Sequence, residues 1–174
     1  MKTSLRLATV LTWFNLLFWG FLIAMMALYA FALRAIPLFI PLVLFSSIPL
    51  NSYAALQLQK SIRQPVIRLS SQTPTGIRFV GFVAMFFAIS FVLNGFTLLG
   101  NAQSFIKILK EQMTQVKQTD LVFLTPANIQ FLAVVIIFLG LCAGLNVILN
   151  FRLLRWYYLV KQSDVDSPGA NDER

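Results

Sequence analysis

The sequence predicts an all-α integral membrane protein, a bundle of four membrane-spanning helices. The chain of 174 residues is 58% hydrophobic and only 11% charged, whereas a soluble domain carries about 25% charged residues. Its uncharged runs cover 7–33, 35–59, 79–106 and 121–151. Each run exceeds the roughly 20 apolar residues that a helix needs to cross a bilayer. Runs such as FLAVVIIFLG do not alternate in polarity, which excludes a membrane β-barrel.

Four spans follow from these runs, at 7–32, 36–58, 78–100 and 127–150. The first uncharged run has 27 residues, which is too long for a signal peptide with its apolar stretch of about 7–15 residues. The spans predict one domain over 1–162, arranged as two antiparallel hairpins. The acidic and polar residues 163–174 have little to bury, so we expect a disordered tail.

Positive charge predicts the orientation of the spans. Four spans place both termini on one side of the membrane. That side then holds Lys2, Arg6, Lys60, Arg63, Arg68, Arg78, Arg152, Arg155, Lys161 and Arg174, and the opposite side holds Arg34, Lys107, Lys110 and Lys117. The positive-inside rule therefore places the termini and the basic loop 59–77 in the cytoplasm, in a plasma or inner membrane. The same rule explains the net charge of +8 without a nucleic-acid partner.

Threonine and proline together predict where two helices begin. Thr73-Pro74 and Thr125-Pro126 each precede an apolar run. In this pattern the threonine caps the free N–H groups and the proline occupies the first helical position. Between the third and fourth spans, the outer segment 101–126 is expected to be partly helical. It either forms a close-packed cap or continuation of the third span, or it lies in the membrane interface.

Pro49 lies deep in the second span, where it predicts a kink. A proline inside a helix removes one backbone hydrogen bond and crowds the preceding turn. Ser46, Ser47 and Ser52 are close enough in sequence to bond the freed carbonyl groups.

Small residues recur along the third and fourth spans. Lipid tails are as apolar as leucine, so membrane helices associate through close packing and buried hydrogen bonds. The expected packing residues are Gly81, Ala84, Ala88, Gly95, Gly140 and Gly144, of which the last two form a GxxxG pair. Packing within the chain is the first interpretation, and self-association is the second.

Every span also contains an asparagine. The helical rise places Asn15, Asn51 and Asn146 at a similar depth, roughly 9–12 Å from the cytoplasmic edge. Asn94 lies nearer the outer side. We expect the first three to face the interior as a polar cluster, because a carboxamide in hydrocarbon needs partners. Such a cluster either holds the helices together or lines a path for a lipid headgroup, a substrate or an ion.

Apart from Arg78 at the edge of the third span, the predicted spans contain no Asp, Glu, Lys or Arg, and the chain has no histidine. Proton relays and ion-coupled transporters usually depend on such groups. Cys142 is the one cysteine, so neither a zinc nor a haem site is expected. Motifs of phosphate-binding loops, zinc proteases and serine hydrolases are missing as well. The sequence therefore predicts neither an enzyme nor a cofactor-binding protein.

Three functions remain. The first is a non-catalytic accessory, assembly or scaffold subunit of a membrane complex, which associates with itself or with another membrane protein. The second is a small channel or uncoupled transporter lined by asparagine, serine and the kinked second span. The third is a lipid-binding protein, in which Lys60, Arg63, Arg68 and Arg78 contact anionic headgroups.

Overall fold

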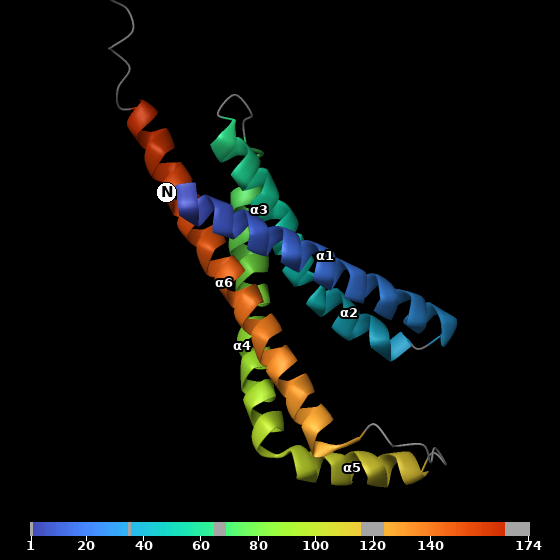
Figure 1. The fold of residues 1–174 in the computed structure, drawn as a ribbon. Helices are drawn as coiled ribbons and strands as arrows, with labels where there is room; N and C mark the ends of the chain where they lie inside the picture. Colours follow the sequence, from blue (N-terminus) through green and yellow to red (C-terminus); the bar gives the residue numbers. More distant parts are fainter. Residues whose placement is uncertain (1, 35, 65–68, 116–123, 166–174) are drawn as a thin grey trace, which may run out of the picture. The chain divides into compact units, whose positions relative to one another are not determined.

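The computed structural model describes residues 2–34, 36–64, 69–115 and 124–165, and these residues form helices with short connections (Figure 1). The helices are α1 (Lys2–Ala32), the 3-10 turn η1 (Ile36–Leu38), α2 (Phe39–Phe45), α3 (Ser47–Arg63), α4 (Gln72–Gly100), α5 (Ala102–Gln115) and α6 (Pro126–Val165). The all-α class is therefore confirmed.

Four stretches of these helices are long and apolar enough to cross a membrane: Thr3–Ala32, Phe39–Arg63, Gln72–Gly100 and Pro126–Val160. This confirms the four predicted membrane helices. The helices run past the predicted ends because a charge stops a hydrophobic run but not a helix. Thus α4 begins before Arg78, and α6 continues beyond Arg152 as far as Val165. The first three residues of the expected tail are helical, and residues 166–174 lie outside the described part.

The chain divides into two compact units. The first comprises Met1–Met85 and Leu145–Arg174, and the second comprises Phe86–Gly144. Helices α4 and α6 pass through both units, so each unit contains half of each helix. The two units are described separately below.

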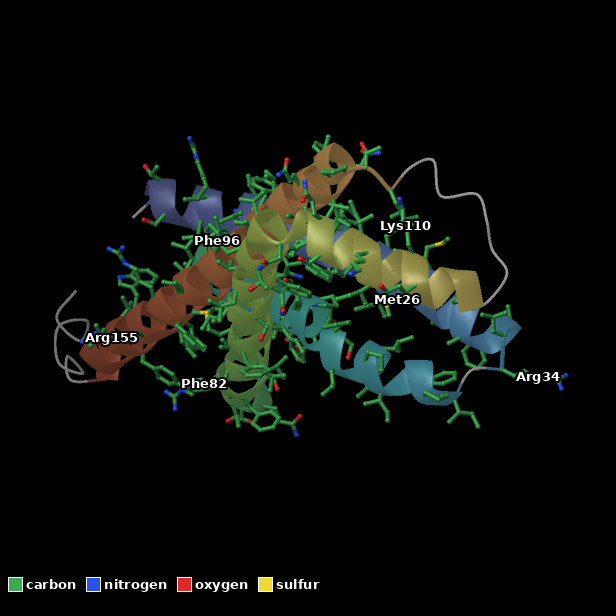
Figure 2. The ribbon with its side chains drawn as sticks, turned by 90° about the horizontal axis from the view of Figure 1, so that it is seen from below. Met26, Arg34, Phe82, Phe96, Lys110 and Arg155 are labelled. Carbon is green, nitrogen blue, oxygen red and sulfur yellow. The ribbon has the colours of Figure 1, made fainter. Side chains whose placement is uncertain are left out.

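The turn after α1 belongs to the first unit and depends on Arg34. This residue has a positive φ of 52°, the left-handed conformation that commonly ends a helix. Arg34 N donates to Phe31 O at 3.2 Å, and Ile36 N donates to Arg34 O at 3.2 Å. Figure 2 shows the Arg34 side chain pointing away from the helices. After this tight turn, α2 and α3 pack along α1.

Pro49 breaks the second span, as expected, but the break lies earlier in the chain. Helix α2 ends at Phe45, four residues before Pro49, because a proline ring crowds the carbonyl of residue i−4. Pro49 is then the third residue of α3, where its missing N–H costs no helical hydrogen bond. The Ser46 hydroxyl donates to Val43 O, and the Ser52 hydroxyl donates to Ile48 O at 3.0 Å. These two serines thus bond carbonyl groups near the break.

An apolar layer joins four helices in the first unit. Its buried residues are Ala8 of α1, Leu58 of α3, Ile77 of α4, and Leu153 and Leu154 of α6. Leu5, Ala54, Ile62, Leu149 and Tyr157 are among the half-buried residues that pack around them. This layer lies near the helix ends that carry the chain termini and the loop after α3.

Helix α5 caps the second unit. It begins after a turn at Asn101 and runs at a steep angle to α4 (Figure 1). Ala102 and Ile106 of α5 are buried against Leu124 and Ile129, and Leu98 and Leu109 pack around them. Over Ala102–Gln115, the segment between the third and fourth spans is therefore a separate, close-packed helix rather than a straight continuation of α4.

The two threonine–proline pairs behave differently. Thr125 caps α6 as predicted, because its hydroxyl accepts from Asn128 N at 3.2 Å and Pro126 is the first helical residue. The prediction for Thr73 is wrong. Helix α4 begins at Gln72, and the Thr73 hydroxyl bonds Gln57 Oε1 at 3.1 Å. A tertiary partner on α3 thus replaces the local cap.

Glycines allow α4 and α6 to approach closely in each unit. In the first unit, a methyl group on Gly81 would lie 2.8 Å from the Phe151 ring and 3.2 Å from Asn51 Oδ1. In the second unit, one on Gly95 would lie 3.1 Å from Ala133 O, and one on Gly140 would lie 2.9 Å from Ala88 O. Of the expected packing residues, Gly81, Ala84, Ala88, Gly95 and Gly140 are buried, and Gly144 is half-buried.

Replacing Gly140 with alanine should destabilise the protein by about 1–3 kcal/mol, the usual cost of overpacking. The added methyl group would meet a backbone carbonyl, which cannot rotate away as a side chain can. Gly20→Ala is the matched control, because no atom lies within 4 Å of a methyl group there. Thermal unfolding in mild detergent measures both variants, and equal midpoints for the two would contradict the close contact.

Candidate functional site

Polar side chains gather inside the first unit. Among the described residues, those that are polar and buried are Thr12, Asn15, Ser47, Asn51, Ser52, Gln59, Ser61, Thr73, Asn146 and Asn150. All of them are uncharged. An unpaired polar group in hydrocarbon costs several kcal/mol, so the partners of these groups determine what this region can do.

Four of these side chains form a hydrogen-bonded network between three helices. Thr12 Oγ1 of α1 donates to Asn146 Oδ1 of α6 at 2.8 Å. Gln59 Nε2 of α3 donates to Thr12 Oγ1 at 3.0 Å. Asn146 Nδ2 donates to Ser52 Oγ of α3 at 3.1 Å. The Asn146 amide therefore uses both its oxygen and its nitrogen between helices.

Helical spacing brings these groups together. On α1, Ala8, Thr12, Asn15 and Trp19 recur at intervals of three or four residues, and all four are buried, so they lie on one helix face. Ser52 and Gln59 are seven residues apart on α3 and also share a face. The outward faces of α1 carry large apolar residues such as Val10 and Leu17. Apart from Trp19, the inward face thus carries small and polar residues, the reverse of a soluble helix.

The three asparagines of the predicted cluster are all buried. Their exposed fractions are 0% for Asn15, 1% for Asn51 and 1% for Asn146. Asn146 belongs to the network, whereas Asn15 Nδ2 donates to Leu11 O of its own helix at 2.8 Å. The direct partners of Asn146 are Thr12 and Ser52. Sequence reasoning did not place Thr12 or Gln59 in the cluster, although Thr12 lies on the same α1 face as Asn15.

Two buried asparagines keep unused hydrogen-bonding capacity. Neither the oxygen nor the nitrogen of Asn51 and Asn150 has a hydrogen-bond partner among the described residues, and Gln59 Oε1 has none either. Asn150 lies one turn beyond Asn146 on α6 and is fully buried. Native buried amides are normally satisfied by protein or by ordered water. At these amides the described residues therefore supply no partner, and a further polar partner would be favourable.

The basic residues predicted to contact headgroups lie in two grooves. Lys60 and Arg63 line a groove of about 330 Å³ between α1 and α3, with Trp13 and Gln59. Arg63 Nη2 donates to Thr9 Oγ1 there at 2.7 Å. Arg78 lines a separate groove between α4 and α6, together with Arg155. Arg68 lies outside the described residues.

A polar stripe runs along α4 in the second unit. Ser90, Asn94 and Thr97 follow one another at spacings of four and three residues, which puts them on one face of α4. Asn101 follows four residues after Thr97, in the turn that ends the helix. The side chains of Asn94, Thr97 and Asn101 are exposed, and that of Ser90 is half-buried. Each donates to a carbonyl of its own helix, at 2.8–3.1 Å, to Phe86, Ser90, Leu93 and Thr97 in turn. We call these four residues the α4 stripe.

Neither the first unit's interior nor the α4 stripe contains acid–base or metal-binding groups. No group of three His, Cys, Asp or Glu side chains that could hold a metal lies within the described residues. The chemistry available at both places is neutral hydrogen bonding.

Comparison with family models, with curated proteins and with solved structures found no match for this chain.

The network predicts energetic coupling between Thr12 and Asn146. Hydrogen bonds between membrane helices contribute about 0.6 kcal/mol on average and up to about 1.7, and this one lies in the middle of a chain of bonds. A double-mutant cycle with Thr12→Val and Asn146→Leu should therefore give a coupling of about 1 kcal/mol in detergent unfolding. Thr12→Val combined with Asn94→Leu is the control, because the partner of Asn94 among the described residues is Ser90 O of its own helix. Strictly additive effects for the first pair would contradict the network.

Proposed function

We propose that this chain is a non-catalytic, multi-pass membrane protein that acts as an accessory, assembly or scaffold subunit of a membrane complex. The observation that carries the proposal is the α4 stripe. It places the Asn94 carboxamide and two hydroxyls on a helix long and apolar enough to cross a membrane, with the Asn101 carboxamide directly after its end. Three of the four side chains are exposed.

An exposed asparagine on such a helix has bonding capacity that lipid cannot use. Each carboxamide offers two donors and one acceptor oxygen. Asn94 and Asn101 each use a donor to bond their own backbone. The Asn94 oxygen lies outside the protein interior but within the span, where hydrocarbon offers no donor. Asn101 lies at the end of the span. A second membrane helix that carries serine, threonine, asparagine or glutamine would satisfy them.

Helix α4 itself fits this description of a partner. A carboxamide both donates and accepts, so two copies of α4 related by a twofold axis can exchange hydrogen bonds through Asn94. Interfaces with twofold symmetry are self-complementary in this way, and they are the commonest in oligomers. A homodimer through the α4 stripe is therefore the simplest assembly that satisfies the exposed amides.

A second function is favoured by the unused amides of Asn51 and Asn150. In a small channel or uncoupled transporter, these buried groups would bind water or a polar solute along a path through the first unit. The α4 stripe would then be an assembly surface of that channel. The network favours the first function, because Thr12, Ser52, Gln59 and Asn146 already bond one another.

We further propose that the spans form two antiparallel hairpins with both termini in the cytoplasm. The support is the charge distribution: Arg63 and Arg78 flank the loop on the side of the termini, together with Arg6, Arg152 and Arg155. Cytoplasmic loops carry such an excess of lysine and arginine.

In a Cys142→Ser background, this orientation predicts that Gln103→Cys reacts with an impermeant thiol reagent added to intact cells. Gln64→Cys, at the end of α3, should react only after the cells are opened. Both positions are exposed. The opposite labelling pattern would show that the protein is inverted.

The α4 stripe predicts a helix contact centred on Asn94. In the Cys142→Ser background, Asn94→Cys should form an oxidative cross-link between two copies in native membranes, whereas Phe96→Cys, exposed on another face of α4, should not. Replacing Asn94 and Asn101 with leucine should weaken the association about five- to tenfold, which corresponds to about 0.6 kcal/mol per lost contact. Phe96→Leu is the matched control.

Three other outcomes are informative. If Asn94→Cys does not cross-link, but a second membrane protein co-purifies and is lost on Asn94→Leu, the partner is a different chain. If the leucine variant and the control associate equally, the stripe has no role in assembly. If reconstituted vesicles pass an ion or a polar solute, and Asn150→Leu blocks it, the channel function replaces the scaffold.

A further inference from the structure

We infer that the groove between α4 and α6 in the first unit binds an anionic phospholipid, with its phosphate between the guanidinium groups of Arg78 and Arg155. The groove has a volume of about 490 Å³ and belongs wholly to the first unit. It is independent of the α4 stripe, so either proposal can fail without the other.

The groove has an apolar floor and a cationic rim. Leu154, which is 3% exposed, and the half-buried Phe151 form the floor. Phe82 of α4 and Leu159 of α6 form the walls and are largely exposed. Figure 2 shows Phe82 on α4 and Arg155 near the end of α6.

The lining residues face the groove because of their spacing along the two helices. Arg78 and Phe82 are one turn apart on α4, and Phe151, Arg155 and Tyr158 recur at four and three residues on α6, so each set shares a face. Gly81 lets the Phe151 ring lie against α4, since a methyl group there would be only 2.8 Å from it. The Phe82 and Phe151 rings then pack with their centroids 5.7 Å apart.

Arg78 is held in place but keeps its charge available. Its guanidinium lies 5.6 Å from the centre of the Tyr158 ring, a distance at which a cation is attracted to the face of an aromatic ring. Arg78 and Arg155 are exposed, and neither makes an ion pair with a carboxylate of the described residues. Arginine offers a planar set of donors that suits phosphate oxygens.

The apolar floor distinguishes a lipid from free phosphate. Phe82 and Phe151 lie one helical turn deeper in the spans than Arg78 and Arg155, respectively. A lipid bound by its phosphate at the rim would lay an acyl chain along these rings. Tyr158 lies at the level of the arginines, where tyrosine is common at the membrane interface. Free phosphate would use the rim and leave the floor uncovered.

The groove with Lys60 and Arg63 is the weaker candidate. The Arg63 guanidinium already donates to Thr9 Oγ1, and that groove is smaller, at about 330 Å³. Arg63 is thus partly committed to α1, whereas Arg155 has no such bond among the described residues.

The proposal predicts selective lipid retention by the full chain in nanodiscs of phosphatidylcholine with a minority of phosphatidylglycerol. Native mass spectrometry after release from the discs counts the lipids that remain bound. The double variant Arg78→Gln/Arg155→Gln should lose the preference for phosphatidylglycerol about 30-fold, from two contacts of about 1 kcal/mol each. The matched control is Arg6→Gln/Arg152→Gln, which removes two exposed arginines of the first unit outside the groove.

Retention that falls only in the groove variant supports the site. The conservative double variant Arg78→Lys/Arg155→Lys should keep part of the preference, because lysine retains the positive charge at both positions. Equal loss in the two glutamine variants would show that general surface charge attracts the lipid, and would overturn the site. A further arm adds inorganic phosphate at millimolar concentration. Displacement of the lipid at that concentration would mean that the rim binds phosphate alone and that the floor plays no part.

Discussion

The constraint on which this structure depends is that hydrocarbon offers no hydrogen bonds. Backbone groups meet the constraint by forming helices, which is why nearly all of the described residues are helical. Polar side chains must meet it by forming hydrogen bonds with one another or with the backbone. The Asn146 amide does so most fully, because it accepts from Thr12 of α1 and donates to Ser52 of α3. This one residue of α6 thereby holds two other helices at fixed positions.

The helices associate through different contacts in the two units. Lipid gives no hydrophobic force between helices, so association needs either polar bonds or very close contact. The first unit uses both. Its hydrogen-bonded network lies next to the apolar layer that includes Ala8 and Leu58. In the second unit the close contacts are made by glycines, where Gly140 lies against the carbonyl of Ala88. Polar bonds specify which side chains must face each other, whereas glycine contacts mainly require that nothing larger intervenes.

The spans could be predicted from the sequence because their physical cause is local. An uncharged run long enough to cross the bilayer as a helix is best interpreted as a membrane span. The break near Pro49 follows from the shape of the proline ring. The network could not be predicted in full, because a threonine hydroxyl has several uses. Thr12 bonds another helix, Thr125 caps its own helix, and Thr97 bonds the turn before it. Asn94 and Asn146 show the same limit, since one is exposed and the other buried, although both lie in helices that are mostly apolar. Which face turns inward is decided by tertiary contacts.

The arginines at the ends of the spans show how one residue type can serve two purposes. Topology requires only that enough positive charge lies on one side, and Arg6 or Arg152 contributes to this as well as Arg78 does. Binding requires position as well as charge. Arg78 has the Tyr158 ring beneath its guanidinium and Arg155 across a groove whose floor is apolar. If Arg78 and Arg155 served only to orient the chain in the membrane, this arrangement of rings and charges would have no purpose. The distinction between charge and position therefore separates the arginines that orient the chain from the pair that we expect to bind lipid.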